Sequence, residues 1–217
     1  MAESYVIGVD FGSDSVRALI VNTETGENVG QGVACYPRWK AGLYQHPEYS
    51  IFRQHPLDYL ESLEKCITTA LAELTEEQKD HVIGIGVDTT GSTPVPVDKN
   101  GTPLALLDEF AENENAMFFL WKDHAAAAEA DEINKLFRNN SENDYTKYQG
   151  DYSAEWYWAK ILYAVRHDEA IRQAAYTWEE HCDWMTGILC GETRPEKIYH
   201  SACAAGHKAL WHSEWNG

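Results

Sequence analysis

Two short apolar runs, each ending in an aspartate and followed by a turn of glycine and hydroxyl residues, constrain the fold most. They are residues 5–10 (YVIGVD), followed by FGSDS, and residues 82–88 (VIGIGVD), followed by TTGS. A nearly continuous apolar run of this length is typical of a buried strand. Ligands of α/β sheets collect at the carboxyl ends of such strands, so we expect Asp10 and Asp88 to border one crevice.

The rest of the first half alternates further strands with one helix. Residues 16–21 and 29–36 are β-rich and follow the first run after short turns, which indicates an antiparallel meander. Residues 37–55 have no clear period and are predicted to form a loop. A helix with one apolar face is expected from Pro56 to about Leu74. With the run at 82–88 and a fifth strand at 93–97, this order indicates a mixed α/β sheet with helices packed on it.

The second half is predicted to be mainly helical. Helices are expected over residues 125–137 and from a Ser153 cap to about Arg166. The pattern Thr177-Trp178-Glu179-Glu180 is typical of a capping box, and Gly191 is a natural end for the helix that it would start. No repeat and no linker rich in glycine or serine divides the chain, so we expect one domain.

Charge and composition exclude several classes of function. Among 217 residues, 17 Lys and Arg stand against 35 Asp and Glu, giving a formal charge of −18. This balance argues against nucleic-acid and anionic-membrane partners, because both are bound through clustered basic residues. No apolar run approaches the roughly 18 residues of a membrane span, and no signal peptide is evident. The five cysteines include no CxxC pair and suit a reducing, cytoplasmic compartment.

The two turns have the residue types of a phosphate site. Gly12 would let backbone N–H groups approach a phosphate, and the hydroxyls that follow it would add donors. Asp10 would hold Mg²⁺ through water, since this ion dehydrates reluctantly. Plain polar turns remain the alternative for each segment taken alone. His200, Cys203 and His207 have a spacing that zinc ligands use, but no second tight pair accompanies them, so zinc is not favoured.

Six segments together carry a resemblance to a known family. In chain order they are DFGSDSVRALIV, GIGVDTTGSTPVPVD, FAENENAMFFLWKDH, SAEWYWAKILY, CDWMTGILCG and AGHKALWH. Over residues 5–215 the chain resembles the N-terminal half of FGGY-type carbohydrate kinases. The resemblance implies a ribonuclease-H-like fold, as in actin, hexokinase and heat-shock ATPases: a mixed β-sheet flanked by helices. It also implies phosphoryl transfer from ATP, with Mg²⁺, to a pentulose, foremost L-ribulose in arabinose catabolism.

The resemblance also assigns roles to residues. Phosphate and ATP binding fall to Asp10, Gly12, Ser13, Ser15 and Arg17, with Asp10 also the metal residue. Sugar binding falls to Asp88, Thr90, Gly91, Trp121, Asp123, Glu155 and Lys208. Thr90-Gly91 stands where glycerol kinases carry an Arg-Glu pair, which leaves space for a different sugar. Burial in a core for Trp121 and a solvated surface position for Lys208 remain open alternatives.

Members of this family are longer than this chain. The resemblance therefore implies that residues 1–217 form the N-terminal, sugar-binding half, and that the catalytic base and the adenosine-binding segment lie in a C-terminal domain absent here. We expect little kinase activity from the chain alone. The expected partners are a sugar, ATP and, for the full-length enzyme, further copies of itself in a homo-oligomer. The alternatives are a kinase for xylulose or ribitol, a non-catalytic actin-like assembly domain and a two-metal nuclease, the last disfavoured by the charge.

Overall fold

The chain groups into two compact units. The computed structural model describes residues 3–140, 145–147, 150–207 and 209–215. One unit comprises Met1–Leu43 and His55–Thr90, and the other comprises Tyr44–Gln54 and Gly91–Gly217. That the two act as a single domain stays a prediction. Among the described residues, no helix has the length and apolar character needed to cross a membrane.

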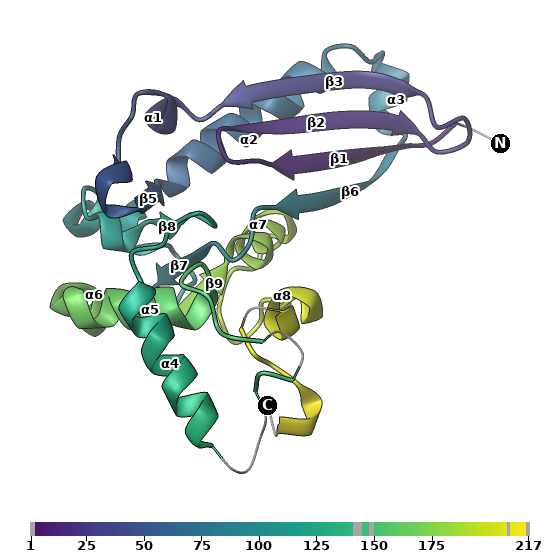
Figure 1. Ribbon diagram of the computed structural model, residues 1–217. Helices are drawn as coiled ribbons and strands as arrows, with labels where there is room; N and C mark the ends of the chain where they lie inside the picture. Colours follow the sequence, from purple (N-terminus) through teal and green to yellow (C-terminus); the bar gives the residue numbers. More distant parts are fainter. Residues whose placement is uncertain (1–2, 141–144, 148–149, 208, 216–217) are drawn as a thin grey trace. The chain divides into compact units, whose positions relative to one another are not determined.

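A four-stranded mixed sheet forms the first unit, in the order β3-β2-β1-β6 (Figure 1). Its strands are β1 (Tyr5–Phe11), β2 (Ser15–Asn22), β3 (Asn28–Cys35) and β6 (Val82–Thr89). The first three form the predicted antiparallel meander, and β6 pairs in parallel with β1. The parallel pairing follows a crossover through α2 (Pro56–Leu71) and α3 (Glu76–Asp80). The predicted mixed α/β sheet is therefore confirmed, but the strand expected at 93–97 is not part of it, because residues 94–97 pair with residues 177–180 in a separate sheet.

Helix α2 covers one face of this sheet. Alternate residues of the strands, such as Ile7, Val9 and Ile20, are buried on that face, and α2 contacts both β2 and β3. A Cβ on Gly32 of β3 would lie only 2.1 Å from the carbonyl oxygen of Cys66 in α2. The close approach of helix and strand thus requires glycine at this position.

The expectation that both apolar runs are buried strands is wrong in detail. In β1 only alternate residues are buried, and Gly8 is exposed on the other face. Strand β6 lies at the end of the sheet, where Ile83 and Ile85 are 70% and 42% exposed. The side chains of a strand point to the two faces of the sheet, and α2, which covers one face, packs mainly on β2 and β3 and leaves β6 with little cover.

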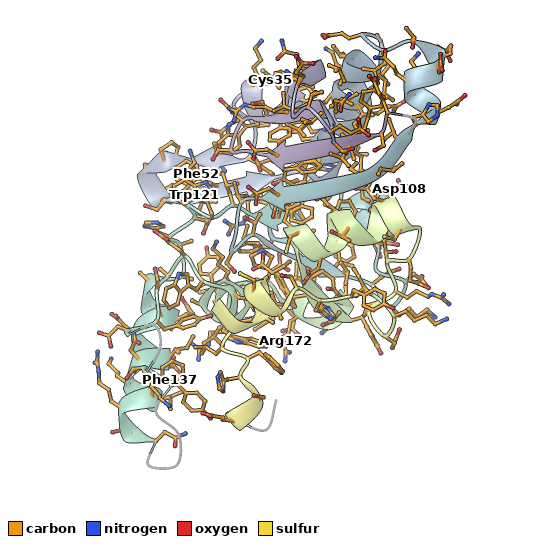
Figure 2. All side chains as sticks on the ribbon, turned by 90° about the vertical axis from the view of Figure 1, so that its right-hand side faces the viewer. Cys35, Phe52, Asp108, Trp121, Phe137 and Arg172 are labelled. Atoms are coloured by element: carbon orange, nitrogen blue, oxygen red, sulfur yellow. The ribbon has the colours of Figure 1, made fainter. Side chains whose placement is uncertain are left out.

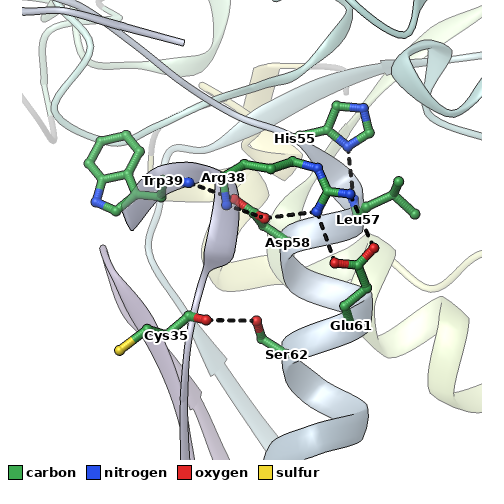
Figure 3. A network of polar contacts seen from close by, with 8 residues as sticks. All are labelled: Cys35, Arg38, Trp39, His55, Leu57, Asp58, Glu61 and Ser62. Atoms are coloured by element: carbon green, nitrogen blue, oxygen red, sulfur yellow. Dashed lines mark hydrogen bonds and ion pairs between the residues drawn. The ribbon is translucent and has the colours of Figure 1, made fainter. Parts of the chain in front are cut away.

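The segment between β3 and α2 is held by a network of polar contacts (Figure 3). The short helix α1 (Pro37–Lys40) begins there, and Asp58 accepts hydrogen bonds from the backbone N–H groups of Arg38 (3.1 Å) and Trp39 (3.0 Å). The Arg38 guanidinium also donates to Asp58 (3.0 Å) and, through two nitrogens, to Glu61 (2.9 and 3.1 Å). These hydrogen bonds lower the pKa of Glu61. The start of α1 is therefore fixed to the first turn of α2.

Two small sheets and five helices, with short 3₁₀ turns between them, make up the described part of the second unit. The sheets are β4-β5-β8 and β7-β9. The strands are β4 (Gln45–His46), β5 (Ile51–Gln54), β7 (Pro94–Val97), β8 (Phe118–Phe119) and β9 (Thr177–Glu180). The helices are α4 (Ala127–Asn139), α5 (Tyr157–His167), α6 (Glu169–Ala174), α7 (His181–Cys190) and α8 (Ala202–His207). The 3₁₀ turns are η1 (Pro47–Tyr49), η2 (Leu104–Leu106), η3 (Asp108–Phe110), η4 (Glu114–Ala116) and η5 (Ser213–Trp215).

Three local predictions need correction. Residues 37–55 are not one loop, because they contain α1, β4 and β5. The expected capping box is strand β9, and α7 begins only at His181, because the carboxylate of Glu180 is already bonded to Ser92 and Thr93. Helix α5 begins at Tyr157, since the Ser153 hydroxyl caps only the local turn at Glu155. The predicted end of α7 at a left-handed glycine is confirmed.

Candidate functional site

The carboxyl ends of β1 and β6 bring the two aspartates together. In the parallel register Asp10 lies opposite Asp88. The backbone N–H of Thr90 then donates to the carbonyl of Phe11 (3.2 Å), which holds the start of the second turn against the end of β1. The structure thus places both aspartates at the same end of the sheet, as expected for strands that run in the same direction.

The turn after β1 is tight and partly closed. The Gly12 N–H donates to the Ser15 carbonyl (2.9 Å), and a Cβ on Gly12 would lie 3.2 Å from that same oxygen. Ser15 is buried and its hydroxyl donates to Asp14 (2.9 Å). Gly12 and Ser13 are half-buried at the tip of the turn. Phosphate binding by Gly12, Ser13 and Ser15 stays a prediction. The hydroxyl proton of Ser15 is already donated to Asp14 within the turn.

Opposite charges meet beside this turn. Arg17 on β2 donates to Asp10 (3.2 Å), and both side chains are about half exposed. Behind them Tyr36 is buried, and its pKa is raised first by burial and then by the charges of Asp10 and Asp14. The Tyr36 hydroxyl has no hydrogen-bond partner among the described residues. The Arg17 guanidinium could contact a phosphate, and the half-exposed Asp10 carboxylate beside it could contact a cation bound to that phosphate.

The donor set at this edge fits Mg²⁺. Asp10 and Asp88 offer two carboxylates, and no group of three or more His, Cys, Asp or Glu side chains in the described part of the chain is arranged to hold a metal ion without further ligands. Mg²⁺ prefers such a site, because it keeps several waters and binds through one or two carboxylates together with substrate phosphates. The candidate zinc ligand His200 instead pairs with Glu179 (Nε2 to Oε2, 2.9 Å), and the side chain of His207 lies outside the described residues.

A shallow cavity of about 990 Å³ extends from the carboxyl ends of β1 and β6 over the first unit's sheet. Residues of all four strands line it, and Asp10, Arg17 and Asp88 lie among them. The remaining lining is mostly apolar or glycine, for example Leu19 and Val33. The charged groups are therefore gathered at the end where β1 and β6 finish.

The other predicted sugar residues belong to the second unit. Figure 2 shows Trp121 beside Phe52, and Leu120 donates to the Phe52 carbonyl (3.1 Å). Trp121 is 38% exposed, so it is not a core residue in this structure. Asp123 is completely buried and forms an ion pair with Arg53. Its carboxylate also accepts the backbone N–H groups of Phe52 (2.7 Å) and Ala125 (3.2 Å). Asp123 thus fixes the turn that presents Trp121, and direct sugar contact by Asp123 stays a prediction.

A second acid lies near this turn. Glu155 lies within hydrogen-bond distance of His124 (Oε1 to Nε2, 2.9 Å), and both side chains are part-exposed. The backbone N–H of His124 donates to the backbone carbonyl of Ser50 (2.9 Å). A Cβ on Gly91 would meet no atom within 4 Å, and sugar binding at Thr90-Gly91 stays a prediction. Lys208 lies outside the described residues.

Sequence reasoning missed Arg53, which is 1% exposed and stacks its guanidinium 3.5 Å from the centroid of the Phe119 ring. It lies in the segment expected to be an aperiodic loop, and its partner Asp123 is distant in sequence. The residues around it, Ile51-Phe52-Arg53-Gln54-His55, show no alternation, so the sequence offered no signal for this role.

Comparison with known proteins identifies the family. The sequence model described as "FGGY family of carbohydrate kinases, N-terminal domain" matches residues 5–203. This chain belongs to the FGGY family of carbohydrate kinases. The resemblance stated from the sequence is therefore confirmed.

Two curated relatives of this FGGY domain are both much longer than the chain. It is 53% identical over 216 residues to the ribulokinase of Vibrio parahaemolyticus, covering 99% of this chain and 38% of that protein. It is 37% identical over 215 residues to the ribulokinase of Mycolicibacterium smegmatis, covering 96% and 37%. The chain thus spans less than two fifths of the length of these relatives.

Solved structures confirm the predicted fold class. A xylulose kinase from Bifidobacterium adolescentis matches with a TM-score of 0.73 at 18% identity, over 99% of this chain and 41% of that one. The glycerol kinase of Plasmodium falciparum with ADP matches with a TM-score of 0.70 at 15% identity, over 96% and 38%. At such low identity these matches show the shared actin-like kinase fold alone.

Proposed function

We propose that this FGGY chain is the sugar-binding and phosphate-binding half of a ribulokinase, which transfers the γ-phosphoryl group of ATP to L-ribulose and yields L-ribulose 5-phosphate. The observation that carries the proposal is the 53% identity to a ribulokinase over nearly the whole chain. The adenosine-binding segment and the base that activates the sugar hydroxyl would lie in a further domain.

On the phosphate side, the first unit supplies donors and charge. The turn would direct the N–H and hydroxyl groups of Ser13 at the phosphates, while the Gly12 N–H stays bonded to the Ser15 carbonyl. Arg17 would neutralise part of the phosphate charge. Asp10 would hold Mg²⁺ through water, and Asp88, opposite it in the register, would contact the sugar as the resemblance implies. When bound, the ion supplies further neutralisation of the transferred phosphoryl group.

On the sugar side, the second unit supplies an exposed indole and a polar pair. Trp121, held by the turn that Asp123 fixes, would stack on the apolar face of the pentulose. Glu155 and His124 would accept and donate hydrogen bonds to sugar hydroxyls, since both side chains are part-exposed. The uncharged Thr90-Gly91 would leave room for the ketose. Lys208 remains a sugar ligand by resemblance.

Phosphoryl transfer depends on positioning and charge neutralisation in a closed, dry cleft. One half of such a cleft binds its ligands without orienting them for in-line attack. We therefore expect the 217-residue chain to bind the sugar and to turn over ATP negligibly.

The test is a calorimetric titration of the chain with L-ribulose, D-xylulose, ribitol and glycerol. L-ribulose should bind tightest, and Trp121→Leu should weaken its binding at least tenfold. The matched control Trp39→Leu, on the first unit, should leave the dissociation constant unchanged. Tenfold tighter binding of glycerol or xylulose would refute the pentulose assignment.

The phosphate assignment is tested in the full-length enzyme to which this chain is proposed to belong. Asp10→Asn should lower kcat on the order of 100-fold, the usual loss for one electrostatic group, and leave the sugar dissociation constant nearly unchanged. The exposed Asp131→Asn serves as the control and should change neither. Weaker sugar binding with unchanged kcat would show that Asp10 belongs to the sugar site and not to the phosphate site.

A further inference from the structure

A lysine without any exposed surface lies at the centre of the second unit. Lys160 on α5 is 0% exposed. Its ammonium nitrogen donates to three backbone carbonyls, those of Ser92 (2.7 Å), Leu120 (2.9 Å) and Phe119 (3.4 Å). Lysine is almost never fully buried unless it is paired, and its three N–H donors here have three acceptors.

A buried carboxylate accompanies this ammonium. Glu180, at the end of β9, accepts the backbone N–H of Thr93 (2.9 Å) and is bonded to the hydroxyl of Ser92. Burial raises the pKa of Glu180, while the bonds from Ser92 and Thr93 and the charge of Lys160 oppose this rise. Lys160 and Glu180 thus both hold residues 92–93, the lysine through the Ser92 carbonyl and the glutamate through the Ser92 hydroxyl and the Thr93 N–H.

The segments joined by Lys160 are the ones that carry the predicted sugar residues. Ser92 directly follows Gly91, and Leu120 directly precedes Trp121. Glu155 lies in the approach to α5, the helix that carries Lys160. Packing alone would be served at this position by a methionine or leucine of similar size. A buried charge with three carbonyl partners instead fixes two chain turns relative to one another.

We propose that Lys160 is a positioning residue for the sugar site, whose ammonium sets the Gly91 turn and the Trp121 turn at a fixed separation. The inference rests on the proposed function only in taking these two turns to face the sugar. It predicts that loss of the ammonium loosens both turns together and weakens sugar binding without a general loss of structure.

The test compares Lys160→Gln and Lys160→Met with the exposed control Lys135→Met in the 217-residue chain. Hydrogen exchange read by mass spectrometry should be at least tenfold faster in Lys160→Gln over residues 91–93 and 117–121 and unchanged in α4. Binding of L-ribulose should weaken at least tenfold in Lys160→Gln and more in Lys160→Met. The control should match the wild type in both measurements.

The outcomes separate this inference from the proposed function. Unchanged exchange in the two turns, or exchange that rises uniformly over the unit, would overturn the positioning role. If the wild type binds none of the sugars, the proposed function fails, while the exchange result still decides whether Lys160 holds the turns. If neither variant folds, the ammonium of Lys160 is observed directly by ¹⁵N NMR of the wild type. We expect its protons to exchange slowly with water, and the absence of a slowly exchanging lysine ammonium would overturn the inference.

Discussion

Gly32→Ala in β3 is expected to destabilise the first unit strongly, although it adds one methyl group. The new Cβ would lie 2.1 Å from the carbonyl oxygen of Cys66, 3.0 Å from its carbonyl carbon and 3.2 Å from the N atom of Ala70. All three atoms belong to the backbone of α2, so no side-chain rotation relieves the clash. To reach an ordinary contact of 3.4 Å, α2 must move away from β3 by about 1.3 Å.

That movement separates the helix from the strands on which it packs. Overpacking of a well-packed core costs about 1–3 kcal/mol, and occasionally more. We expect Gly32→Ala to lower the free energy of unfolding by about 3 kcal/mol. The obstacle is the backbone of α2, a helix that buries Tyr59, Leu63 and Cys66 against the sheet. The matched control is Gly8→Ala in β1, where an added Cβ meets nothing within 4 Å. It should stabilise by about 0.5 kcal/mol, through the loss of backbone freedom in the unfolded chain.

The assay is thermal and urea unfolding followed by circular dichroism. For a protein of this size 1 kcal/mol corresponds to about 2–4 °C, so Gly32→Ala should melt roughly 6–12 °C below the wild type. Gly8→Ala should melt at or slightly above it. If the two variants melt within 1 °C of each other, α2 does not lie against the backbone of β3, and the packing described for this unit is wrong.

Two further predictions concern charged pairs of the second unit. Asp123→Asn should lower the free energy of unfolding by about 3–5 kcal/mol in urea titrations, since it leaves the buried Arg53 charge without its partner. Asp151→Asn, from an exposed pair, should change it little, and equal effects would contradict the buried pair. The hydrogen bond to Glu179 raises the pKa of His200 above its usual value, so this pair stabilises fully below about pH 6.5 and less as pH rises through the raised pKa. The melting temperature of wild type relative to His200→Gln should therefore fall between pH 5.5 and 8.5, and a constant difference would refute the pairing.

The sequence predicts the first unit well because its signals are local and periodic. The meander, the crossover helix and the second aspartate-ended strand each occupy enough residues to show a period, and chain direction then places Asp10 beside Asp88. What it could not show is that β6 is an edge strand. Strand order at a sheet's end is decided by elements elsewhere in the chain.

The second unit was predicted less well because its elements are short and its key contacts are distant in sequence. Strands β4 and β8 have two residues each, too few for any period. The pattern Thr177–Glu180 meets the rule for a helix start, yet its backbone pairs with β7 and the Glu180 carboxylate bonds to Ser92 and Thr93. Local propensity is overridden there by tertiary partners. Arg53 and Lys160 are found only when the chain is folded, because their partners are 40 or more positions away.

The parallel pairing of β1 with β6 has a consequence for how the protein is made. During synthesis the meander β1-β2-β3 leaves the ribosome early and closes through short turns. Strand β6 emerges only after α2 and α3, and long-range pairing of this kind is slow, because the entropy of closing the intervening chain must be overcome first. Asp10 is therefore placed on a finished hairpin before Asp88 joins it, and we expect the end of the sheet that carries both aspartates to be among the last parts of this unit to assemble.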